Sequence, residues 1–256
     1  MSEQRPSDSR DPIQEKDPGD IKRATEEIFG INLRSIHTLK DLLIRPQAVF
    51  AAYAQRDTVT YTPALRLWLG LIGISFLVSF IWGGYQGIIR RSVEQWPPEQ
   101  RADFVASLAQ ADMDLEAYVD RFADAAQLIH TPLIALCTGL VGFIPGLIGK
   151  GLTWQARLNI TFAILAIASL IGIFLSPITI YAPDLMIVPI VIIALIYGIT
   201  HYRGTPGLPN YTPRWRITRA AVFSVVTITM VMVGGVIMAL SSVIYAMWPI
   251  FQLAMN

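Results

Sequence analysis

The sequence predicts an all-α fold, a polytopic membrane helix bundle with five transmembrane helices, on two observations. The chain has 256 residues, of which 53% are hydrophobic and only 15% are charged, whereas soluble domains carry about 25% charged residues. Five stretches contain no Lys, Arg, Asp or Glu, and about 20 apolar residues cross a hydrocarbon core of about 30 Å. We expect spans at about residues 67–89, 132–149, 158–176, 185–200 and 220–247.

The charges alternate between the segments that join these stretches, and this alternation predicts the orientation. Residues 1–66 carry ten Lys and Arg, the loop at 150–157 carries two and the loop at 201–219 carries four. Sixteen of the 20 basic residues therefore fall on one side, and basic loops stay in the cytoplasm. We expect the N-terminus inside and the C-terminus outside.

The residues before the first span divide into two segments. Residues 1–20 are polar and contain three prolines, a composition that predicts a disordered cytoplasmic tail. Residues 21–62 are expected to form cytoplasmic amphipathic helices. These are predicted at 21–28, 38–45 and 46–55. They could lie on the cytoplasmic leaflet or pack on the ends of the bundle, and the two arrangements are compatible.

The membrane domain, residues 63–256, includes a long external helical insertion at 90–131. We expect one helix at 99–110 and a second that begins at about 112–114 and runs through Pro132 into the second span. Apolar residues recur on one side of the second helix, which is typical of a helix that packs on a core. We therefore favour a hairpin resting on the outer ends of the spans, with a partner-binding or lid role as the alternative.

Three glycines in the second predicted span are candidates for close helix packing. Gly142 and Gly146 are four residues apart and Gly139 lies one turn earlier, a spacing that lets helix backbones approach. Pro145 between them would break the helix, and a broken helix can line a transport site. We favour helix packing and keep a cavity near Pro145 and Asn159 as the alternative.

The sequence predicts no catalytic residue, no cofactor and no metal site. The single cysteine, Cys137, excludes an intramolecular disulfide and a cysteine zinc site, and the three histidines do not share one side of the predicted membrane. No ionisable group lies at mid-membrane, which counts against an ion-coupled carrier. A net charge of +1 gives no basic footprint, so we expect no nucleic-acid partner.

The segment at 42–69 carries a signature of aromatic, basic and proline residues. An Arg-Pro pair is followed by a Tyr and then by Tyr-x-Pro-x-x-Arg-Leu, at Arg45, Pro46, Tyr53, Tyr61, Pro63, Arg66 and Leu67. It resembles a large bacterial family of uncharacterised multi-pass inner-membrane proteins. The resemblance implies the bacterial inner (cytoplasmic) membrane and the same architecture, but no mechanism, because the family has no settled activity.

The chain departs from the pattern of that family. Members often begin with a Cys-rich zinc ribbon, which is not found here, and Arg56 and Thr58 stand where the family has a glycine and a basic residue. A histidine-containing stretch of the family is not evident at 157–166. The five-span layout is also similar to that of the Yip family of eukaryotic vesicle traffic, by arrangement alone.

The same segment supplies the candidate binding residues. Arg45, Arg56 and Arg66 surround a compact elbow before the first span. These cations could contact anionic lipid headgroups, at about 1 kcal/mol each, or the elbow could simply dock the amphipathic helices against the bundle. We favour the structural role.

These observations predict a non-catalytic membrane protein, a scaffold or accessory subunit. Its expected partners are membrane lipids and either another membrane protein or a second copy of the chain. The alternative is a passive transporter or lipid-handling protein that uses the cavity near Pro145 and Asn159. A membrane enzyme is least favoured, because no catalytic constellation gathers on one side of the bilayer.

Overall fold

The computed structural model describes residues 33–57, 59–144, 146–182, 185, 187–209 and 212–255. These residues form helices joined by short connections, with no strand among them. The predicted tail at 1–20 and helix at 21–28 lie outside the described residues. The α-helices are α2 (Leu33–Ile44), α3 (Pro46–Ala54), α4 (Ala64–Ile81), α5 (Gly84–Glu94), α6 (Pro98–Ala109), α7 (Leu115–Val141), α8 (Trp154–Tyr181), α9 (Ile187–Gly204) and α10 (Arg216–Met255). Two 3-10 turns, η2 (Thr205–Gly207) and η3 (Pro213–Trp215), join α9 to α10.

Five of these helices, α4, α7, α8, α9 and α10, are long and apolar enough to cross a membrane. The all-helical class and the five candidate spans predicted from the sequence are therefore confirmed. α10 is the longest, with 40 residues, or about 60 Å at 1.5 Å per residue.

The first predicted span, 67–89, was wrong at its C-terminal end. α4 ends at Ile81, and the apolar residues that follow belong to the separate helix α5. Gly83 and Gly84 have φ angles of +91° and +59°, left-handed conformations that glycine adopts at little cost and that end a helix. Hydropathy is continuous across this break and does not reveal it.

The second predicted span, 132–149, was wrong at its C-terminal end. Its helix, α7, begins at Leu115, where the Asp114 carboxylate caps the first turn by accepting a 2.7 Å hydrogen bond from a backbone N–H. α7 ends at Val141, and residues 142–144 and 146–149 belong to the connection that follows. The second helix of the insertion and the second span are therefore one continuous helix, as the expected passage through Pro132 implies.

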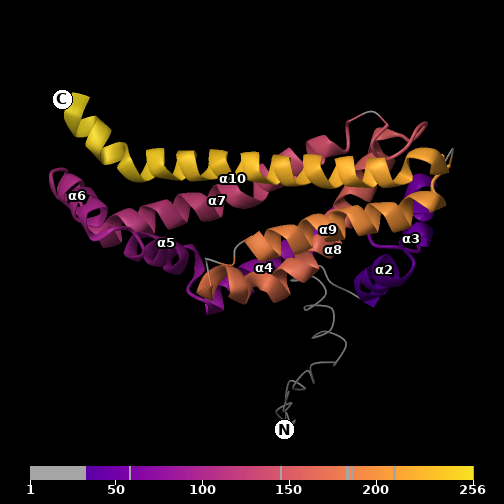
Figure 1. Ribbon diagram of the computed structural model, residues 1–256, viewed down its shortest axis with the longest axis horizontal. Helices are drawn as coiled ribbons and strands as arrows, with labels where there is room; N and C mark the ends of the chain where they lie inside the picture. Colours follow the sequence, from indigo (N-terminus) through magenta and orange to yellow (C-terminus); the bar gives the residue numbers. More distant parts are fainter. Residues whose placement is uncertain are drawn as a thin grey trace, which may run out of the picture.

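The helices pack in two groups (Figure 1). α7 and α10 pack against each other along much of their length, while α4 packs on α8 and α9 packs on both α8 and α10. α8 is the most buried of the five candidate spans and α10 the least. The main core lies where α3, α4 and α8 meet, around Phe50, Trp68, Ile160 and Ile164.

The amphipathic helices before α4 pack on one end of the bundle, with α5 and α6 at the other end (Figure 1). α3 contacts α8, α9 and η2, and α2 contacts α3 and α8. Of the two arrangements that the sequence left open, packing on the bundle is therefore the one observed. α2 and α3 also agree with the helices predicted at 38–45 and 46–55.

Candidate functional site

A group of buried polar side chains lies in the elbow, which we define as residues 33–63. In its first helix, α2, the buried residues are Ser35, Thr38, Asp41 and Leu42. Four large apolar residues of the same helix are exposed. These are Leu33, Ile36, Leu43 and Ile44, with exposed fractions of 80%, 56%, 43% and 59%. α2 therefore buries three polar side chains beside Leu42 and leaves much of its apolar surface uncovered.

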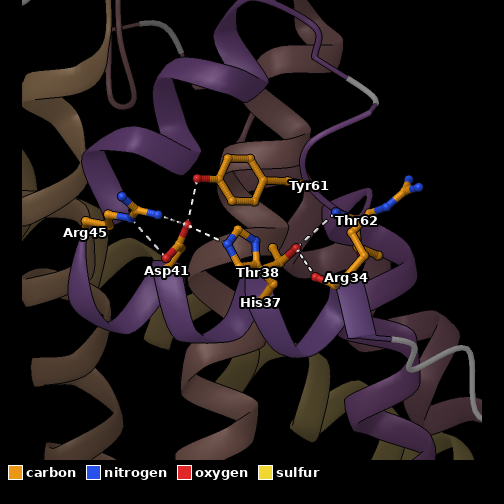
Figure 2. A network of polar contacts seen from close by, with 7 residues as sticks. All are labelled: Arg34, His37, Thr38, Asp41, Arg45, Tyr61 and Thr62. Carbon is orange, nitrogen blue, oxygen red and sulfur yellow. Dashed lines mark hydrogen bonds and ion pairs between the residues drawn. The ribbon is translucent and has the colours of Figure 1, made fainter.

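Asp41 is the centre of the buried polar network (Figure 2). Arg45 donates from Nε to Oδ1 and from Nη2 to Oδ2, each at 3.0 Å, and the Tyr61 hydroxyl donates to Oδ2 at 2.8 Å. His37 Nε2 lies 3.6 Å from Oδ2, and its ring stacks on Tyr61. Asp41 is only 3% exposed, so these donors replace the water that a carboxylate otherwise binds.

A second set of hydrogen bonds ties α2 and α3 to the residue before Pro63. The Thr62 N–H donates to Thr38 Oγ1 at 3.0 Å, and the Thr38 hydroxyl donates to the Arg34 carbonyl at 2.7 Å. The Tyr53 hydroxyl donates to the Thr62 carbonyl at 2.6 Å. The N–H of Thr62 is thus bonded to α2 and its carbonyl to α3. These two hydrogen bonds fix the angle at which α4 leaves the elbow.

The charges in the network favour a permanent ion pair. The hydrogen bond from Arg45 lowers the pKa of Asp41, although burial acts in the opposite direction. Burial raises the pKa of Tyr61, and its hydrogen bond to Asp41 raises that pKa further. Near neutral pH Asp41 is therefore ionised and Tyr61 is protonated. The Tyr61 hydroxyl can then donate its hydrogen bond to the Asp41 carboxylate, which holds α2 against the segment before α4.

α9 holds the elbow from the other side through Arg203. Its Nη1 and Nη2 donate to the carbonyls of Leu43 and Ile44, at 3.0 Å and 2.7 Å. The last carbonyls of a helix have no partner within the helix, so Arg203 caps α2 and links the elbow to the last two spans.

Two glycines, Gly204 at the end of α9 and Gly207 in η2, allow α3 to pack closely against this segment. A Cβ added to Gly207 would lie 2.0 Å from the Gln47 carbonyl oxygen, and one added to Gly204 would lie 2.3 Å from the Phe50 ring. No side chain fits at either position without moving α3. The docking of the elbow therefore depends on glycine at both.

The three arginines predicted to contact headgroups have different environments. Arg45 is held by Asp41. Arg66 is exposed on the first turn of α4, with no ion pair to any described residue. Arg56 is exposed after the end of α3 and has a φ of +61°, the left-handed conformation usually filled by glycine at this position.

Arg56 alone among these arginines lines the elbow pocket, a space of about 110 Å³ between the elbow and α8. Asp57, Gln155 and Asn159 also line it. The pocket thus offers one cation, one anion and two amides. Asn159, one of the two residues named for the alternative cavity, lines this pocket, whereas Pro145 lies outside the described residues.

The glycines predicted to pack helices do not form one stripe. A Cβ on Gly142 would lie 3.0 Å from Thr161 Oγ1, and one on Gly139 would lie 3.7 Å from the Phe162 ring, so both face α8 closely. Gly146 lies beyond the end of α7 with a φ of +76° and open space around it. Its place is in the connection, because α7 ends before it.

The histidines lie apart from one another. His37 belongs to the elbow, and His130 is in α7. His201 is buried in α9, with Nε2 2.9 Å from the Leu147 carbonyl oxygen. Within the described ranges, no three His, Cys, Asp or Glu residues are grouped so that they could hold a metal ion.

Reasoning from the sequence missed Asp41 and Gly207. The role of Asp41 could have been recognised, because it lies four residues before Arg45 in a predicted helix, a spacing that favours an ion pair. The role of Gly207 could not, because its contact with Gln47 joins parts of the chain that are far apart in sequence.

No protein-family model, no curated protein and no solved structure matches this chain.

Proposed function

We propose that this is a five-span protein of the bacterial cytoplasmic membrane, with the elbow in the cytoplasm and α5 and α6 outside. The candidate spans support five crossings. The sixteen basic residues in segments at the elbow end support the orientation, because basic loops stay in the cytoplasm. We propose the bacterial cytoplasmic membrane because the signature at 42–69 resembles the family of multi-pass inner-membrane proteins described above.

We further propose that the protein acts without catalysis, as a scaffold or accessory subunit that binds a membrane-protein partner through α2. The exposed apolar side chains of Leu33, Ile36, Leu43 and Ile44 in α2 carry this proposal. A contiguous patch of large exposed apolar side chains often marks an interaction site, whereas single exposed apolar residues are common on protein surfaces. The Asp41 network and the close contacts of α3 hold this surface in one position, and preorganisation lowers the entropy lost on binding.

The charges around the apolar side of α2 define the partner further. Arg34 and Lys40 are exposed on the same helix and lie close in sequence to Leu33, Ile36 and Leu43. Such a surface suits an apolar helix with acidic flanks, or the headgroup region next to a partner in the same leaflet.

The test is purification of the full chain in mild detergent, followed by mass spectrometry of the proteins and lipids that accompany it. We expect a stoichiometric membrane protein that is lost from the double variant Ile36→Ser, Leu43→Ser. The control is Val105→Ser, which alters an exposed apolar residue of α6 at the other end. A partner retained equally by the double variant would contradict docking on α2.

A lipid-handling role is the second candidate, and the elbow pocket favours it. Arg56 and Asp57 in one pocket suit a headgroup that carries both charges. Arg56→Gly removes the cation and suits the left-handed backbone, so the fold should persist. Under this role one lipid class accompanies the purified protein and is lost from Arg56→Gly. Lipid unchanged in that variant would exclude the pocket as the binding site.

A further inference from the structure

A long apolar groove runs between α9 and α10, away from the elbow pocket. Its volume is about 450 Å³. Residues of α9 at helical spacing, including Val191, Gly198 and Tyr202, form one wall, and residues of α10, including Ala221 and Val225, form the other. The Ser224 hydroxyl, which also lines the groove, donates to the Ala194 carbonyl. That donor is therefore already satisfied within the apolar walls.

The length of the groove matches one leaflet of a bilayer. The α9 wall extends from Val191 to Tyr202, a distance of eleven residue rises, or about 16 Å at 1.5 Å per residue. Half of a hydrocarbon core of about 30 Å has nearly the same depth. The groove reaches along most of α9 and lies in the part of α10 nearest to the 201–219 loop, so its end at that loop would face the leaflet on the elbow side.

The groove ends at a positively charged loop. The Arg216 guanidinium lies 3.6 Å from the centre of the Tyr202 ring, and its Nε donates to the Tyr202 carbonyl at 2.8 Å. The loop at 201–219 contains four arginines and no acid. Arg214, Arg216 and Arg219 make no ion pair with any residue in the described part of the chain. An apolar groove with cations at one end is complementary to a hydrocarbon chain that carries an anionic group at one end.

We propose that the groove binds one acyl chain of an anionic phospholipid, with its phosphate at Arg214 and Arg216. A helix from a second copy of the chain would fill the groove but would leave the arginines without a counter-charge, so the lipid accounts for both features. The site goes beyond the proposed scaffold role and does not depend on it.

The experiment is native mass spectrometry of the full chain with phosphatidylglycerol or with phosphatidylcholine of the same chain length. We expect preferential retention of phosphatidylglycerol. Ala221→Phe puts a ring into the groove from an exposed position and should abolish retention of both lipids. Arg214→Gln should weaken phosphatidylglycerol about five-fold, which corresponds to about 1 kcal/mol, and weaken phosphatidylcholine less, because its choline cation offsets the charge of its phosphate.

Two matched controls should behave like the wild type. Val236→Phe enlarges an exposed residue of α10 outside the groove, and Arg101→Gln removes one charge in α6. If Ala221→Phe elutes as an aggregate, Ala221→Leu replaces it. Equal retention of the two lipids, or retention unaffected by filling the groove, would overturn the proposal. So would conversion of a dimer into a monomer by Ala221→Phe, because a second copy would then occupy the groove.

Discussion

The two ends of this molecule are both helical but are held together in different ways. At the elbow end, buried hydrogen bonds around Asp41 and the backbone contact at Gly207 hold α2 and α3. At the opposite end, α6 packs through a small apolar cluster that includes Leu108. The hydrogen bonds between side chains there are exposed, and one of them is the ion pair of Arg90 with Glu116.

This difference predicts which end keeps a single geometry. A buried polar group that loses its partner costs about 1–3 kcal/mol, so the elbow has few alternative arrangements. Apolar side chains can repack when volume is kept, and exposed ion pairs contribute little. The elbow end should therefore be sensitive to single substitutions and the opposite end tolerant of them, as expected if the elbow presents a surface to a partner.

The largest effect is expected from Gly207→Ala. Its Cβ would collide with the Gln47 carbonyl, and overpacking of this kind costs about 3 kcal/mol at its upper range. We expect a lower unfolding temperature and faster proteolysis within α2 and α3. Gly235→Ala is the control, because its Cβ meets nothing within 4 Å. Equal effects of the two substitutions would contradict the close docking of α3.

Asp41→Ala comes next, at about 2 kcal/mol, because it leaves the buried Tyr61 hydroxyl without an acceptor. The loss should be local. Hydrogen exchange should accelerate in α2 while the amides of α8 keep their protection. Unchanged protection of α2 would show that the network does not hold this helix.

Acid should weaken the same contact. The pKa of Asp41 is lowered in the folded protein from its ordinary value of 3.8, so the stabilisation it provides is present above that value and declines as the pH falls below it. A spin-label distance between α2 and α8 should lengthen below about pH 4 in the wild type. Asp41→Asn should show no such transition. A transition that persists in Asp41→Asn would assign it to another group.

The smallest effect is expected from Glu116→Gln at the opposite end. The ion pair with Arg90 is exposed on both sides, and pairs of this kind contribute about 0.5 kcal/mol. Thermal unfolding should therefore change little at moderate salt. A destabilisation as large as that of Asp41→Ala would remove the contrast between the two ends.

The sequence was sufficient for features that depend on local composition. Five apolar helices follow from hydropathy, and α3 begins at Pro46 as the residue type predicts. The end of α4 at Ile81, just before Gly83, was not predicted, because glycine occurs both within spans and at their ends. The sequence identified the elbow and favoured a structural role for it, with lipid contact by Arg45 as the alternative, but it did not identify Asp41 as the partner of Arg45. Burial of Asp41 depends on how α2 meets Tyr61, which no local pattern encodes.

The proposed five-span topology places the elbow and α6 on opposite sides of the membrane, with the elbow in the cytoplasm. Single cysteines report this directly when Lys40→Cys or Arg101→Cys is made in a Cys137→Ala background, because Lys40 and Arg101 are both exposed. A membrane-impermeant maleimide should label position 101 in intact bacterial cells and position 40 only after the membrane is permeabilised. Labelling of position 40 in intact cells, or of both positions on the same side, would contradict the five-span arrangement with a cytoplasmic elbow.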